Sequence, residues 1–205
     1  MEKLYWVMIN TDYLDYLKQH ETRIPNYDYN REHIKPFYGV LFEKDDLCYV
    51  TTINHYKEEH SKLTTAIDCQ KIYDNQYGKT IAVARLNYMF PVPKDQFERL
   101  DYRNIDNYVD FKDEVAKYNQ ITLLKKILFG LNHSGLQNRA QIVYKNKYER
   151  PDSYMAKRCF DFKQLEELAK EYHIDFDLDE EQDITDTANE IANEINENIE
   201  FIKIK

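Results

Sequence analysis

The hydrophobic pattern of this chain changes its period near the middle, and this change restricts the possible folds more than any other feature. Short apolar runs bounded by turn residues fill residues 4–93, whereas apolar residues recur at three- and four-residue steps from residue 111 onward. The first pattern is typical of β-strands and the second of amphipathic helices. Strands followed by helices favour an α+β domain with antiparallel strands over an alternating βαβ array.

The strand-rich half predicts a strongly curled antiparallel sheet or a small barrel. A β-hairpin is expected with its turn at residues 44–46, and a short helix capped by Thr11 or Asp12 follows the first strand. Phe90–Pro93 is expected to end this region. The predicted strands cover residues 4–9, 36–42, 47–53, 66–73 and 81–86.

The second half predicts three helices. The first has an apolar face of Val115, Tyr118, Leu123, Ile127 and Leu131, and Gly130 or Gly135 is expected to stop it. We place the domain at residues 1–173 and an acidic extension at residues 174–205. The predicted helices cover residues 111–131, 134–148 and 162–172.

The extension contains the whole net charge of the chain. Residues 175–205 contain eleven acidic and two basic residues, a net charge of -9, so the remainder is neutral. Its isoleucines fall at helical spacing and predict an amphipathic, acidic helix. Two interpretations stay open: the helix docks on its own domain, or it binds a partner or covers a basic groove.

Several classes of protein are excluded by what the sequence lacks. No run of 18 apolar residues is present, and the first residues do not resemble a signal peptide, so we expect a cytoplasmic protein without a membrane partner. Three widely spaced cysteines predict reduced thiols and no structural zinc. The motifs GxSxG, GxxxxGK[ST], GxGxxG and HExxH are missing, and we expect neither a metal nor another cofactor.

One cluster of reactive side chains remains. Lys35 stands where the first hairpin strand begins, and the second strand is followed by hydroxyl, amide, imidazole and ammonium groups. Because the start of one hairpin strand lies beside the end of the next, pairing is expected to bring the two groups together. The second group consists of Thr51, Thr52, Asn54, His55, Lys57 and His60.

These residue types suit RNA cleavage without a metal. A histidine can remove the proton of a ribose 2′-OH or protonate the leaving 5′ oxygen, because its unperturbed pKa is near neutrality. A lysine stabilises the charge that develops on the phosphate. The alternative is that a histidine and a lysine at a strand end are ordinary surface residues.

Five segments occur in an order that resembles the ToxN/AbiQ family, the ribonuclease toxins of type III toxin–antitoxin and abortive-infection systems. The resemblance extends from about Leu4 to about His173. The matching segments are Tyr13–Lys18, Arg23–Asn26, Lys35–Val40, Leu86–Val92 and Phe160–Glu166.

The resemblance implies a Kid/MazF-like curled sheet and an endoribonuclease that leaves 2′,3′-cyclic phosphate ends. It also implies an RNA substrate, an inhibiting antitoxin that is a small repeat RNA, and closed assemblies of toxin with antitoxin. A protein antitoxin is the alternative partner. The family connection further implies a role in phage defence.

The resemblance also suggests site residues. Lys57 and His60 match the family's Lys-x-x-His, Lys35 matches its upstream lysine and Tyr13 its early tyrosine. Its two hydroxyl positions fall on Asn54 and His55, with His55 as a candidate base; an alignment through Thr51 and Thr52 restores the hydroxyls but breaks the lysine spacing. We take Lys35, Thr52, Asn54, His55 and Lys57 as the candidate catalytic set, and an inactive homologue that only binds RNA or protein as the alternative.

Two further stretches are candidates for RNA contact. Residues 26–33 alternate aromatic and cationic groups, and the family's loop tyrosine falls on Arg31 or, with a gap, on Tyr29; tyrosines at the rim of the core are the alternative. A later basic stretch has tyrosines between its cations, and a solvated helix is the alternative there. The candidate RNA-binding residues are Tyr13, Tyr29, Arg31, His60, Lys145, Lys147, Arg150, Lys157 and Arg158.

Overall fold

The computed structural model describes residues 4–25, 37–62, 66–74 and 77–172 of the chain. The chain divides into two compact units, residues 1–169 and 170–205. Only residues 170–172 of the second unit lie in the described part. The predicted domain boundary after residue 173 and the predicted acidic helix lie outside it and stay predictions.

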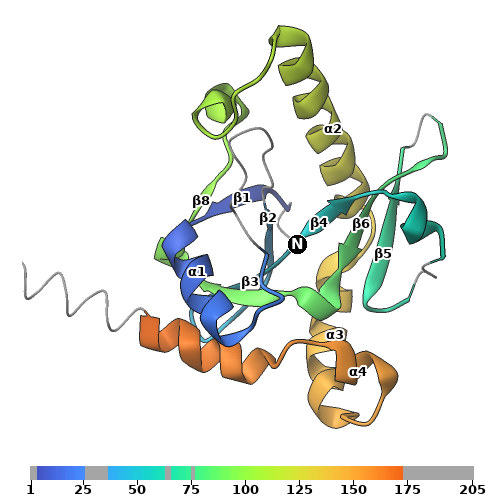
Figure 1. Ribbon diagram of the computed structural model, residues 1–205. Coiled ribbons are helices and arrows are strands. Elements are labelled where there is room, and N and C mark those ends of the chain that lie inside the picture. Colours follow the sequence, from blue (N-terminus) through green and yellow to red (C-terminus); the bar gives the residue numbers. More distant parts are fainter. Residues whose placement is uncertain (1–3, 26–36, 63–65, 75–76, 173–205) are drawn as a thin grey trace, which may run out of the picture. The chain divides into compact units, whose positions relative to one another are not determined.

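The first unit contains two antiparallel sheets and several helices, so the α+β prediction is confirmed and the closed barrel is wrong (Figure 1). One sheet has five strands in the order β7-β3-β2-β1-β8, and the other has three in the order β4-β6-β5. The strands of the first sheet are β1 (Trp6–Ile9), β2 (Phe37–Lys44), β3 (Leu47–Thr51), β7 (Phe90–Pro93) and β8 (Phe97–Arg99). Those of the second are β4 (Ile53–His55), β5 (Cys69–Tyr73) and β6 (Thr80–Arg85).

The predicted hairpin forms between β2 and β3. Lys44 pairs with Leu47, which leaves a turn of two residues. These residues, Asp45 and Asp46, have φ angles of 51° and 64°. Two positive φ angles define a type I′ turn, whose twist matches that of the strands, and aspartate is one of the few residues other than glycine that adopt this conformation readily.

The predicted strand over residues 47–53 is interrupted at Thr52, where the chain leaves the first sheet for the second. β3 pairs with β7, whereas β4 pairs with β6. The strands that pair with β3 and β4 change sheets at the same place: β6 leads into β7 through the 3-10 helix η2 (Leu86–Tyr88). At the end of β3, the Thr51 hydroxyl donates to the carbonyl oxygen of Arg85 at 2.8 Å. The sequence pattern continues through Thr52, so it gave no sign of this crossing.

The edge strands β7 and β8 were not predicted as strands. β7 contains Pro91 and Pro93, which lack an amide hydrogen and therefore read as the end of the strand region. Among the described strands, β7 pairs on one side only, with β3. Proline is tolerated on such an edge because no partner requires its amide hydrogen on the open side.

The three predicted helices are confirmed with small shifts at their ends: α2 spans Glu114–Asn132, α3 spans Leu136–Glu149, and a further helix spans residues 162–172. α4 (Tyr154–Arg158) was not predicted. Gly130 lies inside α2, and Gly135, with a φ of 65°, separates α2 from α3. Three short 3-10 helices complete this part: η1 (Glu58–Lys62), η3 (Lys94–Gln96) and η4 (Tyr102–Asn107).

The first predicted helix is α1 (Thr11–His20), but its cap is different from the prediction. The side chain of Asn10 accepts from the backbone N–H of Asp12 at 3.0 Å, so Asn10 and neither Thr11 nor Asp12 is the N-cap. Tyr13 and Leu17 are buried beneath the helix.

The buried face of α2 also differs from the prediction. Leu124, Ile127 and Leu131 are buried. By contrast, Val115 and Tyr118 are 68% and 70% exposed, although the apolar pattern placed them on the core face. Two aromatic or branched residues at helical spacing therefore do not contribute to the core here.

Several segments that resemble the ToxN/AbiQ family meet inside the core. The hydroxyl of Tyr13 donates to the carbonyl oxygen of Pro91 at 2.8 Å. The backbone N–H of Phe160 donates to the carbonyl oxygen of Asn87 at 3.1 Å. The first contact joins α1 to β7, and the second joins η2 to the segment before the last helix, so these segments serve the fold.

Candidate active site

The predicted catalytic segment lies on and after β4, which is an edge strand of the three-stranded sheet. Asn54 pairs with Val83, and His55 pairs with Ala82. The backbone N–H of Tyr56 extends this pairing by donating to the carbonyl oxygen of Ile81 at 3.0 Å. The sheet therefore holds this segment in a defined register as far as Tyr56.

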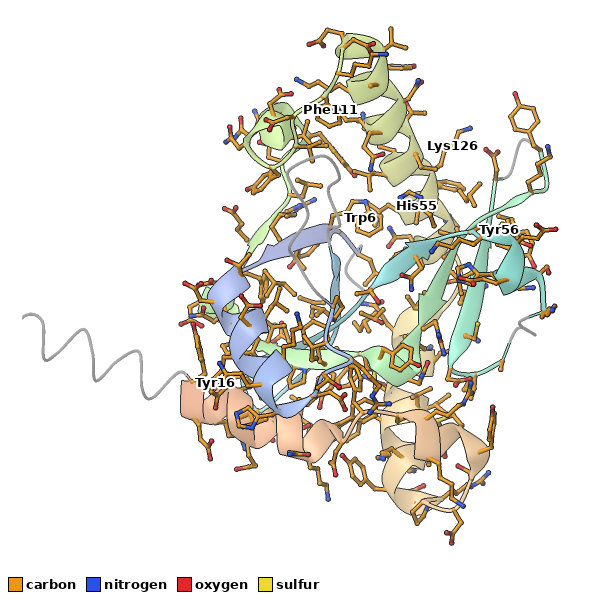
Figure 2. The ribbon with its side chains drawn as sticks, viewed as in Figure 1. Trp6, Tyr16, His55, Tyr56, Phe111 and Lys126 are labelled. Atoms are coloured by element: carbon orange, nitrogen blue, oxygen red, sulfur yellow. The ribbon has the colours of Figure 1, made fainter. Side chains whose placement is uncertain are left out.

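Asn54 and His55 are neighbours in a strand, so their side chains project to opposite faces of the sheet. The row through His55 continues through Ala82 to Ile72 on β5. Ile72 contacts α2, because a Cβ built on Gly130 would lie 2.6 Å from its Cγ2 atom. His55 consequently faces the α2 side of the sheet, as Figure 2 also shows.

The row through Asn54 continues through Val83 to Lys71 and belongs to the other face. On that face, the Nζ of Lys71 donates to the carbonyl oxygen of Ser61, in η1, at 3.3 Å. The structure thus separates two members of the predicted catalytic set, and only His55 shares a face with α2.

Lys57 and His60 form a compact turn at the start of η1. The backbone N–H of Lys57 donates to Nδ1 of His60 at 3.0 Å, and the backbone N–H of His60 donates to the carbonyl oxygen of Lys57 at 2.8 Å. This is the arrangement of a capping box, in which a residue three positions on satisfies the N-cap amide. With Nδ1 as acceptor, the imidazole has its proton on Nε2.

This turn accounts for the Lys-x-x-His spacing. The side chain of His60 is 15% exposed and its ring meets that of Tyr56 edge to face, with centroids 6.0 Å apart. The side chain of Lys57 is exposed. His60 therefore acts on the backbone of the turn, and the ammonium group of Lys57 is left at the surface.

Lys35, Tyr29 and Arg31 lie outside the described residues, so their assignments stay predictions. The predicted approach of Lys35 to Asn54–Lys57 requires one hairpin that continues through this segment. Because β4 belongs to the second sheet, the pairing of β2 with β3 does not extend to Asn54. The proposed proximity of Lys35 to His55 rests on the family resemblance alone.

The two threonines at the crossing have different surroundings. Thr51 is buried and its hydroxyl donates to Arg85, as described above. Thr52 is half-buried in the crossing itself. Of the two hydroxyls, that of Thr52 is therefore the better placed for contact with a bound molecule.

Tyr13 is fully buried, and its hydroxyl donates to Pro91. A side chain in this position offers no surface to RNA, so we correct its assignment from RNA contact to core packing.

The predicted basic stretch is only partly available for RNA. Arg158 pairs with the buried carboxylate of Asp68 at 2.6 Å. The Nζ of Lys147 donates to the carbonyl oxygen of Ala156 at 3.1 Å, which connects α3 to α4. Both cations therefore have partners within the fold: a buried carboxylate for Arg158 and a backbone carbonyl oxygen for Lys147.

The remaining cations of this stretch are exposed. Lys145 forms an i,i+4 pair with Glu149 at 3.5 Å, and such surface pairs are weak. Arg150 is exposed at the C-terminal end of α3, and Lys157 is exposed on α4. These three residues keep their predicted role as candidate phosphate contacts.

A buried carboxylate joins the last helix to the β2–β3 hairpin. Glu166 accepts from the hydroxyls of Tyr49 at 2.6 Å and Tyr144 at 2.8 Å, and pairs with the Nζ of Lys44 at 2.7 Å. Burial opposes the charge on Lys44, but the hydrogen bonds to Glu166 and Asp45 prevail and raise its pKa. Burial and the bond to Glu166 raise the pKa of Tyr49. Neither Lys44 nor Tyr49 therefore changes its charge near neutral pH, and the network holds the last helix against the hairpin.

Within the described residues, no three His, Cys, Asp or Glu side chains are grouped so that they could hold a metal ion. In the same part of the chain, no helix has the length and apolar character needed to cross a membrane.

Solved structures with the same fold come from toxin–antitoxin systems. The chain matches a structure from a study of type III systems in which a non-coding RNA pseudoknot selectively inhibits the toxin, with a TM-score of 0.68, 23% identity, and coverage of 84% of this chain and 99% of that one. It matches AbiQ, a lactococcal anti-phage endoribonuclease of a type III system, with a TM-score of 0.68, 20% identity and the same coverage of both chains. These likenesses define the fold class.

The chain belongs to the family of ToxN toxins of type III toxin–antitoxin systems, whose model matches residues 5–170. It is 24% identical over 102 residues to Endoribonuclease ToxN from Pectobacterium atrosepticum. That match spans 48% of this chain and about 60% of the relative. The family resemblance that the sequence predicted is confirmed.

Proposed function

We propose that this protein is an endoribonuclease toxin of a type III toxin–antitoxin system with a role in phage defence. The family match over residues 5–170 supports this proposal most directly. The observation of the structure that supports it is the position of His55, an exposed imidazole at the end of an edge strand, two residues before the exposed ammonium group of Lys57.

The proposed reaction requires no metal. The imidazole of His55 removes the proton of a ribose 2′-OH, and the freed oxygen attacks the adjacent phosphorus. The bond from phosphorus to the 5′ oxygen breaks, a 2′,3′-cyclic phosphate forms, and the departing oxygen takes up a proton. Lys57 and Lys35 stabilise the negative charge on the phosphate, and Thr52 is a candidate for contact with the same group. DNA lacks the 2′-OH and is therefore not a substrate.

The proposed partner is an antitoxin that is a small, structured repeat RNA. The matching structure comes from a study in which a non-coding RNA pseudoknot inhibits the toxin, which supports an RNA partner here. Exposed cations at Lys145, Arg150 and Lys157 are available to contact phosphates of such a molecule. A closed assembly of toxin and RNA is part of the proposal.

The test is cleavage of purified cellular RNA by the full chain in the presence of EDTA. The proposal predicts fragments that end in 2′,3′-cyclic phosphate, because no step depends on a metal. Intact RNA together with a gel shift would contradict it and favour the second candidate, an inactive homologue that binds RNA. That candidate is favoured by the two family hydroxyl positions, which are Asn54 and His55 and lie on opposite faces of the sheet.

A further inference from the structure

A groove between α2 and β5 has an unusual composition for a solvent-facing surface. Two neighbouring pockets, of about 470 and 420 Å³, share Tyr73 of β5 and Phe129 of α2 among their lining residues. Tyr118 lines the first pocket as well. The three aromatic residues are 47%, 54% and 70% exposed, for Tyr73, Phe129 and Tyr118 respectively. Large apolar groups gathered at one exposed place commonly mark a binding surface.

The helix presents these groups on the side away from the core. Tyr118, Thr122, Lys126, Phe129 and His133 follow one another at steps of four, four, three and four residues, so they form one stripe. At 100° per residue, this stripe lies roughly opposite the buried face described above. The exposure of the aromatic rings is therefore a property of the fold and does not result from a frayed helix end.

Gly130 gives the groove its shape. A Cβ at this position would lie 2.6 Å from Cγ2 of Ile72, so a larger residue would push α2 away from β5. The close approach leaves Tyr73 and Phe129 beside each other at the point where the two pockets meet.

The charge of the groove suits an anion. Its lining residues include two lysines of α2, Lys125 and Lys126, and, among the described residues, one carboxylate, Asp74. Asp74 pairs with Lys126 at 2.8 Å. Two ammonium groups against one carboxylate leave a local excess of positive charge in a chain whose overall charge is negative.

The groove is continuous with the proposed catalytic residue. His55, Ala82 and Ile72 are neighbours across three adjacent strands, and strands lie about 4.8 Å apart, so His55 is about 10 Å from the floor of the groove. His55 and Ile72 face the same side of the sheet. A strand of RNA cleaved at His55 would reach the groove within a few nucleotides.

We propose that this groove binds the unpaired substrate strand next to the cleavage site, with bases stacked on Tyr73, Tyr118 and Phe129 and a phosphate held by Lys125. Aromatic rings stack on any base, and a lysine beside them can hold the backbone. A docked protein helix would use the apolar groups but not the excess of ammonium groups. The inference rests on the proposed function, because it takes RNA as the substrate.

The test compares binding of an unstructured RNA of about 20 nucleotides by the wild-type chain and by the Tyr118→Ala/Phe129→Ala double variant. Both side chains are mostly exposed, so the variant is expected to fold. Stacking contributes about 1–3 kcal/mol per base, so two lost rings should weaken binding at least tenfold. Ile142→Ala, which removes an exposed apolar side chain from α3, is the control and should bind like the wild type.

Two more measurements make the test specific. Lys125→Ala should reduce the dependence of log K on log salt by about 0.7, as expected for one phosphate contact on a single strand. Cleavage by the double variant should slow at low RNA concentration and recover at saturation, because the groove acts on binding.

Unchanged binding by the double variant would overturn the inference, and so would equally tight binding of an RNA duplex, in which the base faces are covered. If the wild type cleaves RNA and the variant binds normally, the proposed function survives and the groove assignment fails. If the wild type neither cleaves nor binds RNA, the proposed function itself fails.

Discussion

The hydroxyl of Tyr13, in α1, donates a hydrogen bond to the carbonyl oxygen of Pro91, in β7, across 2.8 Å of buried core. The two residues belong to separate segments of the family pattern. Their contact explains why a tyrosine follows the start of α1 and why this tyrosine offers no surface to RNA.

Tyr13→Phe should therefore reduce stability and leave the chemistry intact. The variant loses one buried hydrogen bond and leaves the carbonyl oxygen of Pro91 without this donor, which costs about 1–2 kcal/mol. Urea unfolding followed by circular dichroism measures the loss, and RNA cleavage by the folded variant should proceed at the wild-type rate. A large fall in cleavage with unchanged stability would restore the direct role that the resemblance implied.

His60 is expected to act through the backbone of the Lys57 turn. His60→Ala removes the acceptor for the N–H of Lys57. RNA cleavage should fall, because the turn no longer fixes the position of the Lys57 ammonium group. His60→Gln is the informative comparison, because glutamine at the third position of a capping box accepts the same bond. Recovery of most of the activity by glutamine is predicted; equal loss in both variants would point to a direct chemical role for the imidazole.

The fold should lose stability in alkaline solution through Tyr144. Burial and its bond to Glu166 raise the pKa of Tyr144 from 10 to about 12, so the folded state keeps a proton that the unfolded state has lost. The stabilisation is complete below pH 10 and disappears as pH rises through about 12. Near pH 8, Tyr144→Phe should have a lower free energy of unfolding than the wild type. Between pH 8 and pH 12, that free energy should fall less for Tyr144→Phe than for the wild type.

Unfolding free energies in urea across this pH range would show the difference. Tyr154→Phe is a suitable control, because the Tyr154 ring is 77% exposed. Parallel curves for the wild type and Tyr144→Phe would exclude Tyr144 as the titrating group.

Gly39→Ala should destabilise the junction of β1 and β2. A Cβ at Gly39 would overlap with the backbone carbonyl of Tyr5, which already accepts from the N–H of Gly39 at 2.6 Å. Two backbones cannot move apart without breaking the sheet, so a cost of about 1–3 kcal/mol is expected. Val40→Ala, at a half-buried neighbour, controls for changes in the same strand; equal stability of Gly39→Ala and the wild type would show that the strands can separate.

The sequence predicted most elements because local chemistry determines them. The aspartates at residues 45 and 46 allow a tight turn, and the apolar spacing after residue 111 suffices for α2. Prediction from the sequence failed where a contact with a distant part of the chain determines the local structure. The prolines of β7 argue against a strand, because proline is tolerated in a sheet only at an edge, and the edge position depends on the tertiary fold. In the same way, nothing local to Thr52 reveals that the chain changes sheets there.

The candidate site was predicted less well for the same reason. Residue type alone made Arg158 and Lys147 look available for RNA, but Asp68 and the end of α4 occupy them. The groove aromatics were missed because Tyr118 matched the apolar period of α2. A signal was present: Tyr118 and Phe129 lie on the same side as the lysines at residues 125 and 126, whereas a core face has no charges.

The most direct test of the central claim is the rate of RNA cleavage by His55→Ala and Lys57→Ala. Each side chain is exposed, so both variants should fold. Loss of an acid–base or charge-stabilising group should slow cleavage by about 10²–10⁴-fold, and Lys62→Ala, at an exposed lysine in η1, should cleave at the wild-type rate. Wild-type rates for both His55→Ala and Lys57→Ala would contradict the account, because the reaction would then take place elsewhere on the protein.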